Sequence, residues 1–521
     1  MINLKIDAGS SLQTHVVYTI ADDPHANMRA MIWNVEECHA WNSERYEEYL
    51  TRVITAVQRE FPDIKIASIA HDRLAAQAKA VDTVVTRFKD SCILDICCFN
   101  HMLNLVFSDC LNSSPTLSKT VTEILTWQRV LRTARARNEL KQRKCRGCPS
   151  VPQTRWYYVA DLLHYLIENK EAIELFVLND IDNLSRELGY EFLVTELPQS
   201  FAMTMSIIKP LHDFSLILEH RCTTLDHVIP LAVLLLRKWK KGLDHLNEEY
   251  REALRRTAIN FLARLFSNCY QEACAAYLLN GRERMSPCQR TKEVGVASQE
   301  DDVDTSSKDT EGDAHSLQMH TDIGGSSIVI DDLTIEEDTV AECIHNNILI
   351  LEEKSLEQLL NWDFEGEAFE NALKSFARYG TPLGESTEYF RKKLIYWLDE
   401  IKGNGLVQAA NIEGKPSKPW ETWRWLKSLS KWDPDWKDWN LFASMAMTYL
   451  SAAVSEAEVE RMLSIQKHIL GLSMTNISVE TLHARMLLHG KRGMIGTANV
   501  EKKHKPMLSD LIQRYFGDVL D

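Results

Sequence analysis

The chain has 521 residues, of which 45% are hydrophobic and 26% charged, a globular composition with room for two or three domains. Its net charge of −15 comes mainly from residues 299–338, where thirteen acidic residues and one lysine contribute −12 and leave about −3 for the rest, so a nucleic-acid partner is not excluded. No apolar run of about eighteen residues and no secretory signal are evident, which argues against a membrane or secreted protein. The twelve scattered cysteines are expected to be reduced thiols of a cytosolic or nuclear protein.

The first 111 residues alternate between strand and helix patterns. Strands are predicted at 4–6, 14–20, 29–35, 64–70 and 92–98, and helices at 43–61, 74–88 and 101–111. This order, β-β-β-α-β-α-β-α, predicts an α+β/α class with a mixed sheet covered by helices. It matches the ribonuclease H-like fold.

The rest of the chain is predicted to be mainly helical. Helical spacing dominates residues 113–285 and returns at about 340–402, and after a Gly/Pro/Trp-rich stretch it continues to about 490. Between them, residues 289–340 are polar and acidic, and we expect disorder there because they cannot bury enough apolar surface.

Two aspartates follow predicted strands. Asp7 ends the first strand and Asp72 follows the fourth. In a ribonuclease H-like sheet the first and fourth strands are neighbours, so the carboxylates would lie side by side and could share a divalent cation such as Mg²⁺, which prefers hard oxygen ligands. The alternative is that both are ordinary turn residues at strand ends.

A thiol and an imidazole lie three residues apart where a strand joins a helix. Cys98 and His101 could form half of a zinc site, with Cys145 and Cys148 as the other half. The long gap to the second pair favours the alternative, in which His101 packs at the sheet edge and Cys98 is a buried thiol.

Basic residues are concentrated at 129–148, where eight Lys or Arg accompany one Glu. They form either a solvated helix face or a strip that contacts phosphates, in which we include Arg143, Lys144 and Arg146. A Thr-Arg-Trp sequence follows, in which Trp156 could stack on a base while Arg155 contacts phosphate. Alternatively, Trp156 anchors the next helix.

A helix is predicted at 441–464. It would place Glu456 and Glu460 on one face, most simply a solvated acidic face.

These motifs resemble the hAT superfamily of DNA transposases and the host proteins derived from them. Residues 98–105, Cys-Phe-Asn-His-Met-Leu-Asn-Leu, resemble the family's Cys-x-x-His-x-Leu-Asn-Leu segment, and 154–156 resemble its Thr-Arg-Trp motif. Residues 455–464 resemble its Ser-x-Ala-x-x-Glu-Arg-x-Phe-Ser motif, and 472–489 resemble the end of its dimerisation region.

The resemblance implies a ribonuclease H-like sheet interrupted by a large all-helical insertion and completed by C-terminal helices. The core would begin in 1–112, with the insertion at 113–430, the C-terminal dimerisation region at 431–495 and a tail at 496–521. Asp7, Asp72 and Glu460 would be catalytic ligands of Mg²⁺ or Mn²⁺. Arg155, Trp156, His101 and Cys98 would contact or position DNA, and the C-terminal region would form a homodimer or higher oligomer.

Several departures favour an alternative function. The family usually has Trp soon after its first Asp and Asp-Asn-Ala-x-Asn at its second, whereas residues 8–10 here are Ala-Gly-Ser and 73–76 are Arg-Leu-Ala-Ala. The family's zinc-binding BED finger is not seen before the first strand. The chain is therefore expected to be either a DNA-cleaving transposase-like enzyme or an inactive relative that acts as a dimerising interaction or regulatory protein.

Overall fold

The structure is a computed structural model, and it describes most of the chain. The described residues are 2–11, 14–23, 28–37, 42–72, 75–149, 158–188, 198–220, 223–280, 334–401, 419–431, 434–456 and 508–520. Between residues 7 and 37 the description covers the backbone alone.

Five strands near the N-terminus form one mixed sheet. They are β1 (Ile2–Ser11), β2 (Thr14–Asp23), β3 (Met28–Glu37), β4 (Ile66–His71) and β5 (Leu94–Cys97), in the order β3-β2-β1-β4-β5. β2 pairs antiparallel with both β1 and β3, whereas β1, β4 and β5 pair in parallel. The mixed sheet and the strand positions confirm an α+β protein, as the sequence predicted.

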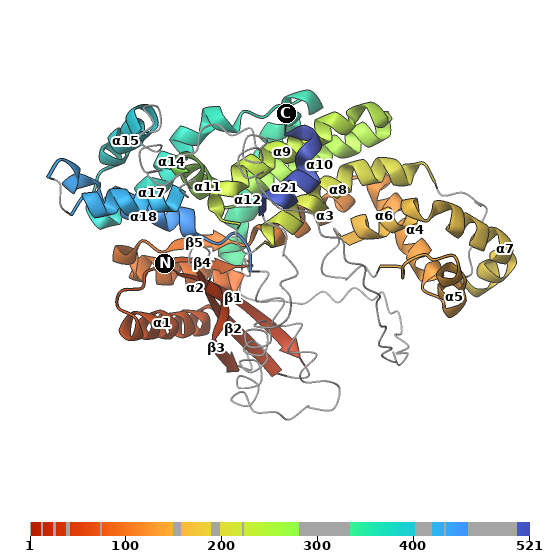
Figure 1. Ribbon diagram of the computed structural model, residues 1–521, viewed down its shortest axis with the longest axis horizontal. Coiled ribbons are helices and arrows are strands. Elements are labelled where there is room, and N and C mark those ends of the chain that lie inside the picture. Colours follow the sequence, from red (N-terminus) through yellow and green to blue (C-terminus); the bar gives the residue numbers. More distant parts are fainter. Residues whose placement is uncertain are drawn as a thin grey trace, which may run out of the picture.

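Helices α1 (Ser43–Glu60) and α2 (Ala75–Arg87) cover one face of this sheet (Figure 1). The Asn42 side chain caps α1 by accepting a hydrogen bond from the Arg45 amide at 3.0 Å. Apolar residues recur along α1 at helical spacing and pack against alternate residues of β1, such as Leu4 and Ile6. This burial holds the helical layer on the sheet.

The opposite face receives α18 (Asn440–Ser451), from far along the chain. Asn3 of β1 donates to the carbonyl oxygen of Ser451 at 2.8 Å and accepts from the Ser68 hydroxyl of β4 at 2.8 Å. All three residues are buried. C-terminal sequence is thereby fixed to the centre of the N-terminal sheet.

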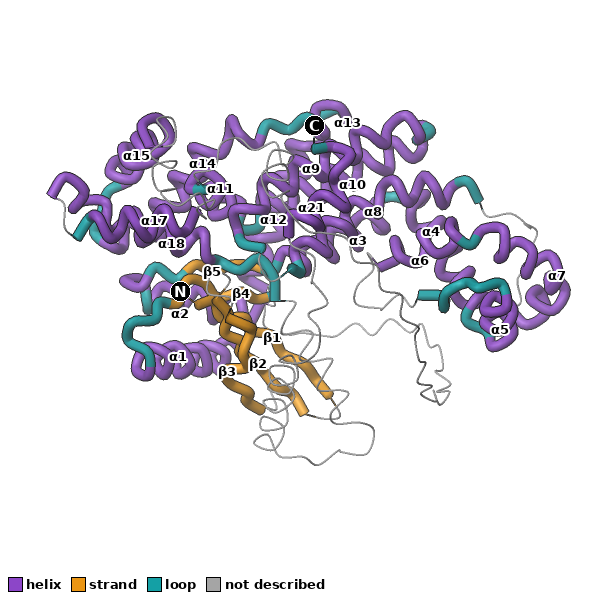
Figure 2. Tube along the Cα trace, viewed as in Figure 1, coloured by secondary structure: helices purple, strands orange, loops and turns teal. Residues whose placement is uncertain are grey.

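Most other described residues are helical and spread along the long axis of the molecule (Figure 2). The helices are α3 (Phe99–Ser113), α4 (Pro115–Leu131), α5 (Ala134–Gln142), α6 (Val159–Glu168), α7 (Lys170–Leu188), α8 (Ser200–Leu218), α9 (Val228–Gly242), α10 (Glu248–Phe266), α11 (Tyr270–Leu279), α12 (Thr334–Glu352), α13 (Leu356–Leu360), α14 (Phe364–Gly380), α15 (Thr387–Tyr396), α17 (Pro419–Leu429) and α21 (Leu508–Phe516). A large apolar core joins α3 and α8–α11 to α14–α18, and a smaller one joins α4–α8. Figure 1 shows α5 and α7 at the end of the molecule opposite α15.

Two predicted elements differ from the structure. The helix expected at 441–464 ends at Ser451, because the next backbone groups bond elsewhere: Leu225 donates to the Ala452 carbonyl at 3.1 Å and Phe99 to the Val454 carbonyl at 3.0 Å. The acidic segment expected to be disordered to 340 overlaps α12, which begins at Thr334, and residues 289–333 lie outside the described part.

One described helix, α8, is long and apolar enough to cross a membrane by length and composition alone. The sequence search for an apolar run did not identify it. Its most apolar window is 67% buried inside the protein, where it packs in both helical cores. A core helix satisfies the same criterion, so α8 is weak evidence for a membrane span.

Candidate functional site

The middle of β1 and the carboxyl ends of β4 and β5 bring three predicted site residues into one row. Asp7 does not end the first strand as predicted, because β1 pairs with β2 as far as Ser11. The last pair of the parallel β1–β4 ladder is Lys5 with Ala70, and the same register continued by two residues places position 7 opposite Asp72. The last pair of the β4–β5 ladder is His71 with Cys97, and the same register continued by one residue places Cys98 beside Asp72. By this register, the backbone positions of Asp7, Asp72 and Cys98 form one row across three neighbouring strands. We call this row, with His101 and Glu456, the sheet edge.

The C-terminal segment reaches the same face of the sheet. Side chains alternate along a strand, so position 7 shares a face of β1 with Asn3, which bonds to Ser451. From Ser451 the chain runs to Glu456, and on the way the amide of Phe99 donates to Val454. Only 2% of the Glu456 surface is exposed, so the solvated acidic face predicted for this residue is wrong.

The thiol of Cys98 lies against this returning segment. Burial raises the pKa of Cys98 well above its ordinary value, and the Glu456 carboxylate acts in the same direction. The Cys98 amide also donates to the His71 carbonyl at 2.7 Å. Cys98 is therefore a neutral, buried thiol that supports the strand ends, the alternative that the sequence favoured.

His101 lies in the first turn of α3, beside Asp72. Burial lowers the pKa of His101, the nearby Asp72 carboxylate opposes this effect, and Arg264 adds to it. Arg264 is itself paired with Asp109 of α3. The imidazole is therefore neutral at physiological pH and can accept or donate a hydrogen bond next to Asp72.

The other predicted site residues fall elsewhere. Arg155, Trp156 and Glu460 lie outside the described residues, and Asp7 is placed by its backbone alone. Within the described part of the chain, Cys98 and His101 do not gather with Cys145 and Cys148 into a metal-binding group. Cys145 and Cys148 instead pack against the α4–α8 core.

A second polar group was missed by the sequence reasoning. His71, Asp95 and Cys97 have ligand atoms that all lie within 4.8 Å of one another. The Asp95 carboxylate oxygen Oδ1 lies 2.8 Å from His71 Nε2. Burial acts to lower the pKa of His71, but Asp95 and Cys97 together outweigh it, so the pKa is raised. The available signal was the spacing of Asp95 and Cys97, two apart in one strand and hence on one face.

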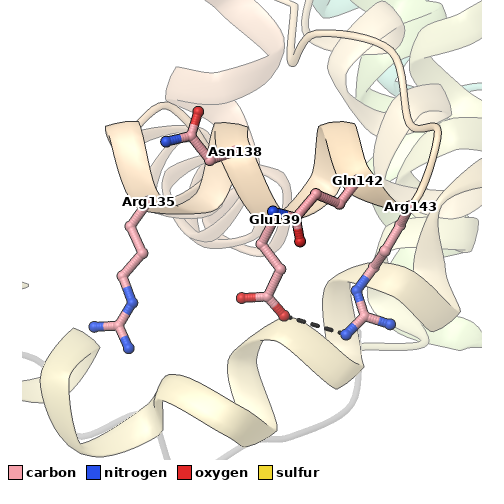
Figure 3. Close-up of a pocket in the computed structure, with 5 residues that line it drawn as sticks. All are labelled: Arg135, Asn138, Glu139, Gln142 and Arg143. Carbon is pink, nitrogen blue, oxygen red and sulfur yellow. Dashed lines mark hydrogen bonds and ion pairs between the residues drawn. The ribbon is translucent and has the colours of Figure 1, made fainter.

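The predicted basic strip occupies α4, α5 and the loop that follows, residues 115–149, which we call the basic arm. All eight of its Lys and Arg residues between 129 and 148 are exposed. Figure 3 shows Arg135 and Arg143 extending from α5, with a dashed line from Arg143 to Glu139 at 3.2 Å. The opposite side of α5 buries Ala136 and Leu140 in the smaller core, which fixes the direction of the basic face.

The loop after α5 is held close to the helix end. The amide of Lys144 donates to the Lys141 carbonyl at 3.0 Å, and the amide of Cys145 donates to the Leu140 carbonyl at 3.0 Å. These are the two bonds of a Schellman motif, with Lys144 in the left-handed region at φ 61°. A defined backbone therefore presents Arg143, Lys144 and Arg146.

These two features define what the molecule can do chemically. The sheet edge brings Asp72 and position 7 together, a pattern that suits a hard divalent cation, and the basic arm suits an extended polyanion. No protein-family model matches the chain, and no curated protein matches it.

Proposed function

We propose that this protein is a hAT transposase-like, DNA-binding and dimerising protein that cleaves and joins DNA strands with the help of a divalent metal ion. The observation that carries this proposal is the row at the sheet edge, where two aspartate positions are adjacent and C-terminal sequence returns beside them. A phosphodiester-cleaving site needs carboxylates close enough to share metal ions.

The topology supports a ribonuclease H-like assignment. β1 lies between the antiparallel β2 and the parallel β4, so the first and fourth strands are neighbours as that fold requires. Helical sequence separates β5 from α18, and α18 then packs back on β1 and β4. This is the pattern of a sheet interrupted by an insertion and completed from the C-terminal side.

In this proposal Asp7, Asp72 and Glu460 hold Mg²⁺ or Mn²⁺. The cations would activate a water or a terminal hydroxyl and stabilise the leaving oxygen of the phosphodiester. His101, neutral and beside Asp72, would hydrogen-bond to a DNA phosphate or to the attacking group. Cys98 would support the ends of β4 and β5 from within the core.

The basic arm would supply affinity for the DNA backbone. Its exposed Lys and Arg would displace counterions from phosphates, independently of base sequence. In the same proposal Arg155 and Trp156, just beyond the arm, contact phosphate and stack on a base. A DNA substrate implies a nuclear protein.

Dimerisation is proposed through the C-terminal region. The apolar residues Met445, Met447 and Leu450 of α18 are buried in the chain's own core. A contact with a second subunit would therefore use other residues of this region. The mass measured at micromolar concentration tests it, and a strictly monomeric protein would contradict this part of the proposal.

The decisive experiment is a strand-cleavage assay with Mn²⁺ on nicked and hairpin DNA. We expect turnover by the wild-type chain and loss of turnover in Asp72→Asn, because this change removes a charged metal ligand with little change in shape. The matched control is Asp63→Asn, which removes an exposed carboxylate in the turn before β4. Its turnover should equal that of the wild type.

The assay also separates the inactive alternative. DNA that is bound but never cut by the wild-type chain would favour the dimerising regulatory protein instead. Cleavage that persists in Asp72→Asn would remove the sheet edge as the active site.

A further inference from the structure

A second group of polar side chains, with different chemistry, lies on the opposite face of the sheet from the proposed catalytic row. His71 precedes Asp72 in β4, and its ladder partner Cys97 precedes Cys98 in β5. Because side chains alternate, His71, Cys97 and Asp95 point to the face covered by α1 and α2, opposite the face that receives α18. One imidazole, one carboxylate and one thiol thus converge at the carboxyl ends of two parallel strands.

We propose that His71, Asp95 and Cys97 form a binding site for Zn²⁺ or a chemically similar transition-metal ion. Nitrogen and sulfur donors with one carboxylate are a ligand set that suits zinc and not Mg²⁺. In a tetrahedral site with bonds of about 2.0–2.3 Å, donor atoms lie roughly 3.3–3.7 Å apart. The donor atoms here lie within 4.8 Å of one another, so small side-chain shifts let one ion contact all three.

The three ligands are already held in place. The side chain of His71 is 1% exposed and that of Asp95 is 16% exposed. The outer edge of β5 is closed by two further groups: the Cys97 amide donates to Cys269 Sγ at 3.2 Å, and the Asp95 amide donates to the Tyr379 hydroxyl at 3.4 Å. These contacts fix the backbone of two ligands. Binding of an ion would therefore require little further ordering of the protein.

Next to the cluster, Arg378 of α14 lies between Glu272 of α11 and Asp82 of α2, 3.8 Å and 3.6 Å away. These ion pairs tie the surrounding helices together. A bound ion would likewise fix the end of β4 to the end of β5. Because Asp72 directly follows His71, the ion would also restrict the backbone position of Asp72. The ion would have three protein ligands and a fourth position for water. This metal site stands independently of the DNA proposal, because neither metal chemistry requires the other.

The test is metal binding by the purified full chain after removal of metals with a chelator. In competition with a chromogenic chelator, we expect the wild type to bind Zn²⁺. With Co²⁺ as a spectroscopic probe, we expect a thiolate-to-cobalt charge-transfer band and the visible bands of a four-coordinate ion. In Cys97→Ser the charge-transfer band should disappear and Zn²⁺ affinity should fall by more than about a hundredfold, since loss of outer partners alone costs 10–100-fold.

Two further variants keep the result interpretable. Cys343→Ser changes an exposed thiol outside the cluster and should bind like the wild type. Asp95→Asn preserves size, so if Cys97→Ser does not fold by circular dichroism, weaker Zn²⁺ binding in Asp95→Asn with the charge-transfer band retained supports the site. A wild-type chain that fails to compete for Zn²⁺, a cobalt spectrum without the thiolate band, or a folded Cys97→Ser with unchanged affinity would overturn the proposal.

Discussion

At the sheet edge Glu456 is 2% exposed and Cys98 is 3% exposed, whereas every Lys and Arg in residues 129–148 of the basic arm is exposed. Both regions are rich in polar side chains. In the first, these side chains pack among strand ends and returning C-terminal backbone. In the second, they project from one face of a short helix and its following loop.

The difference has an energetic consequence. A buried ionisable group responds to its neighbours through a low dielectric, so its pKa moves, as it does for Cys98 and His101. An exposed charge is screened by salt and acts mainly on charged partners that approach it. The sheet edge should therefore be sensitive to loss of single contacts, and the basic arm to ionic strength and total charge.

The largest effect should come from reversing charge on the basic arm. We expect the triple change Arg143→Glu, Lys144→Glu and Arg146→Glu to weaken duplex DNA binding by roughly 100- to 1,000-fold at about 0.1 M salt, and to flatten the salt dependence. Fluorescence anisotropy at several salt concentrations measures both quantities.

The matched control for this change uses α1. Arg45, Arg52 and Arg59 are spaced by seven residues and are exposed, so changing all three to Glu alters net charge equally. This control should retain most of the DNA affinity. Equal losses of DNA affinity in the two triple variants would mean that only net charge matters. The claim that the basic arm contacts DNA would then be contradicted.

A pH effect tests a buried titratable group in the helices that pack against the basic arm. Burial lowers the pKa of His212 in α8 to about 4, although Asp161 of α6 opposes this shift and Lys209 adds to it. Asp213 and the ring of Tyr158 also face His212.

Below pH 6.5 the unfolded chain binds a proton at His212 that the folded chain does not bind. The free energy of unfolding should therefore fall by up to about 3 kcal/mol as the pH decreases from 6.5 to 4. Above pH 6.5 this contribution of His212 to stability should be complete. Urea unfolding of wild type and His212→Gln should diverge by this amount across the window. Parallel pH profiles would show that His212 titrates normally.

A single contact tests the sheet edge. Asn3→Ala removes both the bond to Ser451 and the bond from Ser68, and it leaves a buried carbonyl and a buried hydroxyl without these partners. We expect a loss of about 2 kcal/mol in the free energy of unfolding. Asn440→Ala, at the exposed start of α18, should change stability much less. Equal stabilities would show that α18 is not fixed to the sheet through Asn3.

The sequence predicted what depends on local pattern. A strand or a helix with one buried face leaves its own periodicity in the sequence. The helical spacing over 43–61 predicted a helix, and the structure has α1 at Ser43–Glu60. The adjacency of β1 and β4 was predicted from the order of elements, and the ladder confirms it.

What the sequence could not predict depends on partners far away in the chain. Residues after 451 have helical spacing, but Ala452 and Val454 bond to Leu225 and Phe99, so the helix stops. Likewise, the cluster of His71 with Asp95 and Cys97 requires the register between two strands, which no local pattern specifies. Residues such as Glu460 lie outside the described part, and their role stays a prediction.

The smallest expected effect separates charge from backbone within the basic arm. Lys144 adopts φ 61°, a left-handed conformation that disfavours residues with a Cβ atom, and glycine has no such penalty. Relief of the left-handed penalty, about 1–2 kcal/mol, exceeds the extra unfolded-state entropy of glycine, about 0.5–1 kcal/mol, so Lys144→Gly should stabilise the chain by up to about 1 kcal/mol in urea unfolding. It should weaken DNA binding as much as Lys144→Ala does. Because Lys144→Ala keeps a Cβ atom, it should show the same loss of affinity with no gain in stability. If Lys144→Gly gave no gain over Lys144→Ala, the Schellman geometry would not be under strain at this position. If neither variant changed affinity, Lys144 would not belong to the DNA-contacting face.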